Sequence, residues 1–197
     1  STDTYRLTKK IIYLNNNLKF NVTIPRNALD NVNKIVELGQ NVNISISDKK
    51  VSFDLGDCMI NTRIITGTYP DTSRLIPEDF TQILNISTKE LVGAVDRASI
   101  LLTEKNNVVK LNMSQEDVYV SSKSMEVGFV VEKLNEYSYE GDPLTISFSA
   151  KYLLDAIRAL ASDEISLHFT GDMKPIILKT KTNPNLTQLI LPVRTYN

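Results

Sequence analysis

The chain has 197 residues, of which 42% are hydrophobic and 23% charged, with a formal net charge of −1. These proportions are ordinary for a globular protein, and the near-neutral charge excludes a strongly basic nucleic-acid binder while leaving room for a local basic face. No apolar run approaches the roughly 18 residues that a membrane span needs, and no signal peptide opens the sequence, so no membrane association is predicted.

The first structural unit begins at residues 20–25, FNVTIP, where apolar and polar residues alternate as in a half-buried strand. A helical pattern follows at once, and Pro25 suits a first helical position because its missing N–H costs nothing there. Three further alternating segments predict strands at residues 42–46, 51–55 and 59–65.

The second unit has the same order. It starts with LNIST at residues 84–88, and Ser87 with Glu90 forms a capping box for the helix that follows. The alternating segments VVKLNM, DVYVSS and VGFVVEKL then predict strands at residues 108–113, 117–122 and 127–134.

The third unit opens with LTISFS at residues 144–149, and Ser149 is a plausible helix N-cap. Its later strands are predicted from EISLHF, KPIILKT and TQLILPV, at residues 164–169, 174–180 and 187–193. Every unit is therefore predicted to be β-α-β-β-β.

The three units are in register along the chain. Val22, Leu84 and Ile146 follow one another at spacings of 62 residues, and so do Leu29, Leu91 and Leu153 on the helices. Such a period indicates a repeat architecture. A single unit leaves apolar surface bare, whereas two paired units place two helices over a continuous sheet. The predicted fold class is α+β, with β-α-β-β-β repeats whose helices pack on one face of antiparallel sheets.

Three motifs, found together with the repeats, resemble the bacterial β sliding clamp family, the processivity subunit of the replicative DNA polymerase (DNA polymerase III). They are STDTYRL at residues 1–7, GTYPDTSRLIP at residues 67–77 and LILPVRTYN at residues 189–197. The resemblance runs over the whole chain, and it implies the DNA clamp fold and a function as a sliding clamp that encircles DNA without sequence specificity.

The resemblance also implies a domain organisation. Residues 1–76 correspond to the C-terminal half of the family's middle domain with its interdomain connection, and residues 77–197 to the complete third domain. Full-length family members close head to tail as a homodimeric ring, using the first domain of the neighbouring chain. The chain is therefore expected to be part of a longer protein, and ring closure is not expected of this part alone.

Family members bind short linear motifs of DNA polymerase subunits, the clamp loader and repair proteins in a hydrophobic pocket between the middle and third domains. Carried over position by position, the resemblance implies a peptide-binding site made of Thr2, Arg6, Leu7, Pro70, Arg74, Leu75, Tyr152, Met173, Pro175, Leu189, Leu191, Pro192, Val193 and Arg194.

The residue types at this site suit peptide binding without reference to the family. Leucine and valine side chains framed by prolines make a stiff apolar surface, because proline fixes φ and donates no hydrogen bond. Arginines at its rim could pair with a peptide carbonyl or carboxylate. The alternative is that residues 187–193 form only a final strand whose apolar side chains face the core, and strand alternation allows both.

Basic residues recur along the three helices, and by resemblance these helices line the inner wall of the ring. A clamp must hold double-stranded DNA without reading it, so loose contacts to phosphates are what sliding requires. The candidates for facing DNA are Arg26, Lys34, Lys89, Arg97, Lys151 and Arg158. The alternative is a solvated helix surface of mixed charge.

Nothing in the sequence points to catalysis, so the chain is not predicted to be an enzyme, and no cofactor or metal is predicted. The sole histidine, His168, falls on the polar face of a strand, where a surface histidine is expected. Cys58 lies among strand residues and is expected to be a buried thiol. One cysteine permits no internal disulfide, which fits a reducing interior and a cytoplasmic location.

Two other function classes stay open. One is a non-catalytic β-α repeat protein that binds partners by adding a strand to a sheet edge, with no DNA role. The other is a hydrolase of unrecognised type, for which the sequence offers no candidate site.

Overall fold

The computed structural model describes residues 1–15, 18–103 and 107–195. The chain divides into two compact units. The large unit contains Ser1–Tyr13 and Thr72–Asn197, and the small unit is Leu14–Asp71. Among the described residues, no helix is long and apolar enough to cross a membrane.

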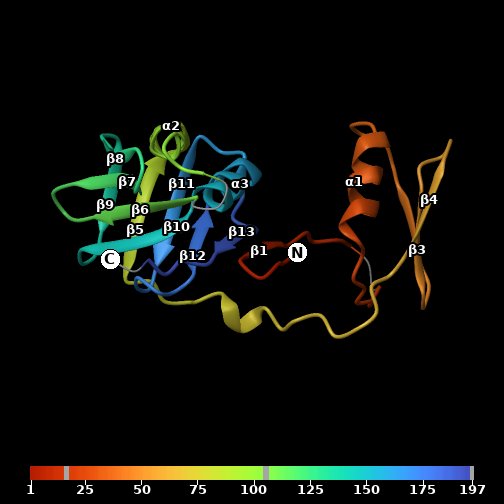
Figure 1. Ribbon diagram of the computed structural model, residues 1–197. Coiled ribbons are helices and arrows are strands. Elements are labelled where there is room, and N and C mark those ends of the chain that lie inside the picture. The colour runs from red at the N-terminus through yellow and green to blue at the C-terminus, as the bar shows by residue number, and fades with distance from the viewer. Residues whose placement is uncertain (16–17, 104–106, 196–197) are drawn as a thin grey trace. The chain divides into compact units, whose positions relative to one another are not determined.

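The large unit contains two antiparallel sheets (Figure 1). The six-stranded sheet consists, in spatial order, of β1 (Arg6–Lys10), β13 (Leu186–Ile190), β12 (Ile176–Lys179), β11 (Glu164–Phe169), β5 (Gln82–Ser87) and β9 (Tyr137–Glu140). The four-stranded sheet consists of β10 (Leu144–Ser149), β6 (Val108–Met113), β7 (Val118–Ser124) and β8 (Gly128–Lys133).

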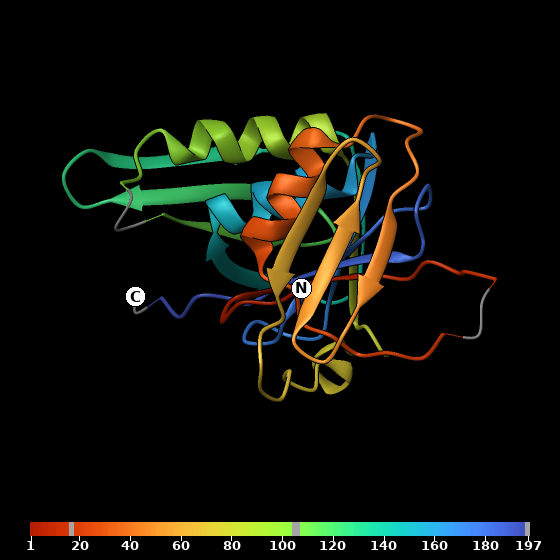
Figure 2. The same ribbon diagram turned by 90° about the vertical axis from the view of Figure 1, so that its right-hand side faces the viewer.

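Two helices close the core of the large unit. Helix α2 (Thr88–Ser99) lies along β7 and β8 (Figure 2), and α3 (Ala150–Leu160) packs against α2, β10, β12 and β13. Both helices present an apolar stripe to the sheets, and both sheets contribute alternate residues to one continuous hydrophobic core. That core includes Leu91, Leu153, Phe148 and Phe169, all almost fully buried. The packing confirms that the helices cover one face of the antiparallel sheets.

The N-termini of both helices are capped as their sequences predict, with one correction. The Ser87 side chain accepts from the N–H of Glu90, and Ser149 accepts from the N–H of Tyr152. The reciprocal half of the capping box is not formed, because the Glu90 carboxylate instead accepts from the backbone N–H of Asn135 at 3.0 Å. Glu90 therefore ties α2 to the segment that precedes β9.

The small unit has one helix, α1 (Arg26–Ile35), and a three-stranded sheet of β2 (Asn43–Ile46), β3 (Lys50–Asp54) and β4 (Met59–Arg63). One expectation is wrong here. Residues 20–25 form no strand ladder. Within the described residues their strand-like contact is a single bond, from the Ile65 N–H to the Thr23 carbonyl. Leu29 is 44% exposed although its counterparts Leu91 and Leu153 are buried.

The structure adds three elements that the sequence did not predict: β1, β9 and a short 3-10 helix, η1 (Ser73–Leu75). It also groups residues 1–13 with the large unit, because β1 pairs with β13. This grouping concerns packing, and the division into a half domain at residues 1–76 and a full domain at 77–197 stays a prediction.

Candidate functional site

A second, smaller apolar cluster lies on the face of the six-stranded sheet that points away from the helices. Leu7, Leu189 and Ile177 are direct neighbours across β1, β13 and β12, and each is at most 3% exposed. Strand alternation sends Ile176, Leu178 and Ile190 to the main core on the opposite face. We call Leu7, Ile177 and Leu189 the outer cluster.

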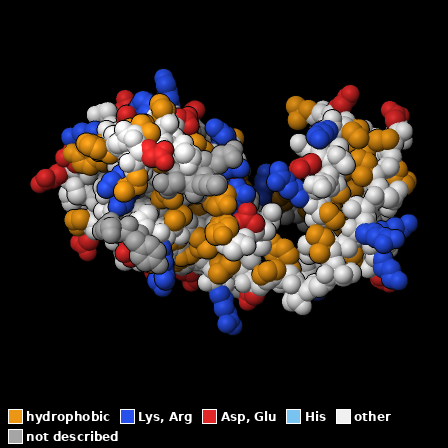
Figure 3. Space-filling view, in the orientation of Figure 1, with side chains coloured by type: hydrophobic (Ala, Val, Ile, Leu, Met, Phe, Trp, Pro, Cys, Tyr) orange, Lys and Arg blue, Asp and Glu red, His pale blue; other side chains and the backbone are white. Residues whose placement is uncertain are grey.

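The outer cluster has only a partial cover. Ile76 and Phe80, from the segment between η1 and β5, pack against it, as does Leu191 just beyond β13, and all three are only partly buried. In the space-filling view, hydrophobic side chains gather on the large unit over β12, β13 and β1 (Figure 3). An apolar surface of this kind, buried beneath and open at its edge, can accept large side chains of a partner.

The chain after β13 forms one margin of this surface. Leu191 N–H donates to the Tyr5 carbonyl at 2.9 Å, and Val193 N–H donates to the Ser147 carbonyl at 2.8 Å. These bonds hold an extended segment in which Leu191, Pro192 and Val193 are half-buried and Arg194 is exposed. The terminal motif thus begins as a core strand and continues as a half-buried extended segment, and the peptide-binding interpretation of residues 187–193 stays a prediction.

The turn between β11 and β12 carries two more of the predicted residues. Met173 is 45% exposed in the turn, and Pro175 is half-buried at its end. Strand alternation places Pro175 on the same face as Ile177, next to the outer cluster.

The polar side chains of Thr2, Asp3, Arg6 and Asp155 meet around the turn that precedes β1, and we call them the polar wall. The wall adjoins the margin of the surface because the Tyr5 carbonyl accepts from Leu191 N–H, and alternation puts Arg6 on the sheet face opposite Leu7. The Asp3 carboxylate accepts from the N–H groups of Tyr5 and Arg6, and Thr2 Oγ1 donates to the Arg6 carbonyl, so this turn is held by its own side chains. The Arg6 guanidinium donates to Asp3 at 3.0 and 3.1 Å and to Asp155 of α3 at 2.9 Å. It lies 4.4 Å from the centroid of the Tyr152 ring.

The charges of this wall stabilise one another. Partial burial alone would raise the pKa of Asp3, but hydrogen bonds from Tyr5 and Arg6 outweigh that effect and hold the pKa below its ordinary value. Burial likewise opposes the charge of Arg6, yet Asp3 and Asp155 raise the pKa of its guanidinium. Asp3 and Arg6 are therefore both ionised at neutral pH.

Three of the predicted peptide-site residues are exposed, and they are not among the residues that pack in or against the outer cluster. Arg74 and Leu75 are exposed on η1, and Leu75 is 44% exposed, whereas its neighbour Ile76 makes the apolar contact. Pro70 is exposed and belongs to the small unit. Sequence reasoning missed Ile76, Phe80, Ile177 and Asp155, which contact the predicted residues.

His168 and Cys58 both differ from expectation. His168 lies on the sheet face away from the helices, as predicted, but it is half-buried because the Phe80 ring packs on it at a centroid distance of 4.8 Å. Burial, and then the charge of Lys179, lowers the pKa of the imidazole, and Nδ1 has no hydrogen-bond partner among the residues that the structure describes. Cys58 is exposed, because it lies in the turn between β3 and β4 rather than in a strand.

The predicted DNA-facing residues fall into two groups. The three arginines are near carboxylates: Arg26 to Asp30 at 3.2 Å, Arg97 to Glu132 at 2.8 Å and Arg158 to Asp155 at 3.9 Å. The three lysines, Lys34, Lys89 and Lys151, are exposed and make no ion pair within the described ranges.

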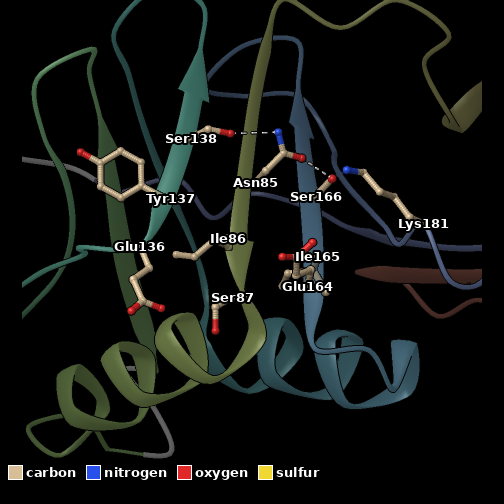
Figure 4. A pocket seen from close by; sticks show the side chains of 10 residues that line it. All are labelled: Asn85, Ile86, Ser87, Glu136, Tyr137, Ser138, Glu164, Ile165, Ser166 and Lys181. Carbon is tan, nitrogen blue, oxygen red and sulfur yellow. Dashed lines mark hydrogen bonds between the residues drawn. The ribbon is translucent and has the colours of Figure 1, made fainter.

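A separate polar groove lies between β9, β5 and β11 (Figure 4). Asn85 stands at its centre, donating to Ser138 Oγ at 3.3 Å and accepting from Ser166 Oγ at 2.5 Å. These groups satisfy one another, and none of the predicted site residues lines the groove. The part of the chain that the structure describes also holds no group of three or more potential metal ligands.

Paired β-α-β-β-β units, with helices on one side of antiparallel sheets and an apolar surface on the other, define the class of DNA clamp folds. The sequence matches the DNA polymerase III beta subunit, central domain, over residues 1–71, and the C-terminal domain of the same subunit over residues 73–194. The chain belongs to the DNA polymerase III beta subunit family, the β sliding clamps.

Similar proteins include the beta sliding clamp of Staphylococcus epidermidis, which is 42% identical over 199 residues, covering 100% of this chain and 53% of that protein. The DNA polymerase sliding clamp of Bacillus subtilis is 41% identical with a TM-score of 0.93, over 100% of this chain and 53% of that one. A sliding clamp from Bartonella birtlesii, solved bound to griselimycin, is 27% identical with a TM-score of 0.93 over 99% and 53% of the two chains. The chain thus spans about half the length of these relatives.

Proposed function

We propose that this chain is the peptide-binding part of a bacterial sliding clamp, a cytoplasmic, non-catalytic processivity factor of the replicative DNA polymerase. Short linear motifs of polymerase subunits, the clamp loader and repair proteins would bind at the outer cluster and its margins. Family membership supports this function, and the observation that carries it is the partly covered outer cluster with Leu191 at its open edge.

The chemistry of the surface fits an extended peptide with one or two large apolar anchors. Leu191 and Met173 offer apolar contact, while the half-buried prolines beside them keep the margins stiff. Large buried anchors dominate the energetics of such interfaces, contributing about 2 kcal/mol or more each.

The helix side of the large unit would hold DNA through its phosphates, without recognising the base sequence. Lys89 and Lys151 are the best candidates there, because their ammonium groups are exposed. Arg97 and Arg158 are paired with carboxylates and would contribute less to DNA binding. On α1 of the small unit, Lys34 meets the same criterion, whereas Arg26 pairs with Asp30.

Ring closure would use the free edge of the four-stranded sheet. Strand β8 is an edge strand, and Phe129 and Val131 on it are 77% and 55% exposed. Exposed apolar edge strands invite pairing with another chain. We propose that a neighbouring clamp chain adds here when the full-length homodimer forms.

The same edge supports the second candidate function, a β-α repeat protein that binds partners only by strand addition at β8 and has no role on DNA. The two functions differ in which substitutions matter. If the chain binds partners only by strand addition, binding would depend on Phe129 and Val131, and substitution of Leu191 would leave it unchanged.

The deciding experiment is fluorescence polarisation of a labelled Gln-x-x-Leu-Phe peptide titrated with this chain. We expect a micromolar Kd that Leu191→Asp abolishes, because the substitution puts a charge at the apolar edge. Ile100→Asp is the matched control, since Ile100 is 76% exposed at the end of α2, outside the outer cluster. Griselimycin, the ligand in the Bartonella structure, should displace the peptide.

A folded chain that leaves the peptide unbound would contradict the proposed pocket. Equal losses from Leu191→Asp and Ile100→Asp would show that the effect is not specific to the outer cluster.

A further inference from the structure

Asp155 occupies an unusual position on α3, between two arginines. One carboxylate oxygen accepts from Arg6 Nη1 at 2.9 Å, and the other lies 3.9 Å from Arg158 Nη1. Arg6 is in turn bound by Asp3, so its guanidinium lies between two carboxylates from different parts of the chain. Because a planar guanidinium forms directional bonds, two such contacts determine the orientation of its plane.

The orientation matters because Arg6 lies on an aromatic stack. Its guanidinium carbon is 4.4 Å from the centroid of Tyr152, and Tyr5 stacks with the same ring at 5.7 Å and an interplanar angle of 25°. Tyr152 and Asp155 both come from the first half of α3. Asp3, by contrast, sits in the same turn as Arg6 and would move with it.

We propose that Asp155 is a positioning residue, which holds the Arg6 guanidinium over the Tyr152 ring and so preforms the polar wall of the peptide site. The inference rests on the proposed function of that site. Without Asp155, Arg6 would keep its bonds to Asp3 but lose its link to α3. The guanidinium would then sample more rotamers, and ordering it on peptide binding would cost conformational entropy.

The geometry also assigns Arg6 a role in recognition. A guanidinium has five N–H donors, and three are used in the bonds to Asp3 and Asp155. The remaining donors can reach a neutral acceptor, whereas a peptide carboxylate would meet two fixed negative charges. Arg6 should therefore bind a backbone or amide carbonyl of the partner rather than an acidic side chain.

The test is a double-mutant cycle on peptide affinity, using Arg6→Gln, Asp155→Asn and the combination, measured by fluorescence polarisation with the Gln-x-x-Leu-Phe peptide. We expect Asp155→Asn to weaken binding about threefold to tenfold. The lower limit is the loss expected for a half-exposed ion pair, and the upper limit is the loss expected for one hydrogen bond between charged groups. In the Arg6→Gln background the same substitution should have no further effect, because Asp155 acts through Arg6.

Two further variants exclude a merely structural effect. Asp155→Glu keeps the charge and should recover part of the affinity. Asp96→Asn removes an exposed carboxylate of α2 that has no ion pair in the described part of the chain, and it should bind like the unmodified protein.

Three results would overturn the inference. If the unmodified chain binds the peptide and Asp155→Asn binds it with the same affinity, the role of Asp155 is refuted and the proposed function stays intact. Additive losses in the cycle would show that Asp155 does not act through Arg6. Failure of the unmodified chain to bind would overturn the proposed function, and this inference with it.

Discussion

His168 shows how a polar-face residue becomes partly buried. Alternation along β11 places its side chain on the other face of the strand from Leu167 and Phe169, as the sequence predicts. The phenyl ring of Phe80, which comes from outside the sheet, then covers the imidazole, and Lys179 lies 5.2 Å from the same ring. Both burial and the nearby ammonium disfavour the charged imidazole, so its pKa is lowered.

The lowered pKa gives a prediction for stability against pH. Below the ordinary pKa of about 6.5 the unfolded chain gains a proton on His168 that the folded chain does not. The stabilisation is therefore fully present above that pH and is lost as pH falls toward the folded-state pKa. We expect the free energy of unfolding to fall between pH 7 and pH 5.5 by less in His168→Asn than in the unmodified chain, as measured by urea denaturation.

The imidazole can also be observed directly, because the chain has a single histidine. Its proton resonances in a one-dimensional NMR titration should shift with a midpoint below that of a histidine peptide. A midpoint at or above the peptide value would contradict the burial of the ring beneath Phe80.

At the scale of elements, the sequence predicts best where alternation is strong. Strands β6 and β11 have the predicted bounds, and β5, β7, β8 and β13 differ from them by a few residues at most. Strand β1, RLTKK, has a single apolar residue, so its pairing with β13 depends on a partner about 180 residues away that local pattern does not reveal. The segment at residues 20–25 shows the converse, since it alternates without forming a ladder.

The candidate site was predictable only in part. Leu7, Leu189 and Leu191 came from the family resemblance, and the structure brings them together. Ile177 could not be separated from Ile176 and Leu178, because all three are buried and only the register with Leu189 identifies the one on the outer face. Local sequence pattern does not distinguish Asp155 from other charges on a solvated helix surface, because Arg6, its partner, is 149 residues away in the chain.

Helix α3 depends on its N-cap, and its first turn also carries Tyr152. The Ser149 hydroxyl accepts from the Tyr152 N–H at 3.4 Å. We expect Ser149→Ala to lower the free energy of unfolding by about 1 kcal/mol, since alanine leaves that N–H without its cap. Ser149→Asp is the matched control, because aspartate caps equally well and also suits the positive end of the helix. Thermal or urea denaturation measures both, and equal losses in the two variants would argue against a capping role.

At the scale of the whole molecule, the two units differ in how much apolar surface they bury. The large unit has a core supplied by two sheets and two helices. Among the described residues of the small unit, the buried apolar ones are Ala28, Val51, Phe53 and Leu55, whereas Leu29, Ile35 and Ile44 are all more than 40% exposed. A unit with so little buried apolar area has little to offset the entropy of ordering its backbone.

Hydrogen exchange should report this difference. Strands β3 and β7 are each hydrogen-bonded on both sides within their sheets, so the two strands differ mainly in packing. Backbone amides exchange through local opening, and the free energy of opening rises with buried contacts. We expect protection factors in β3 to be at least about a hundredfold lower than in β7, because β7 lies beneath α2 in the main core. Mass spectrometry of peptic fragments resolves the two strands, and equal protection would mean that the small unit opens only together with the large one.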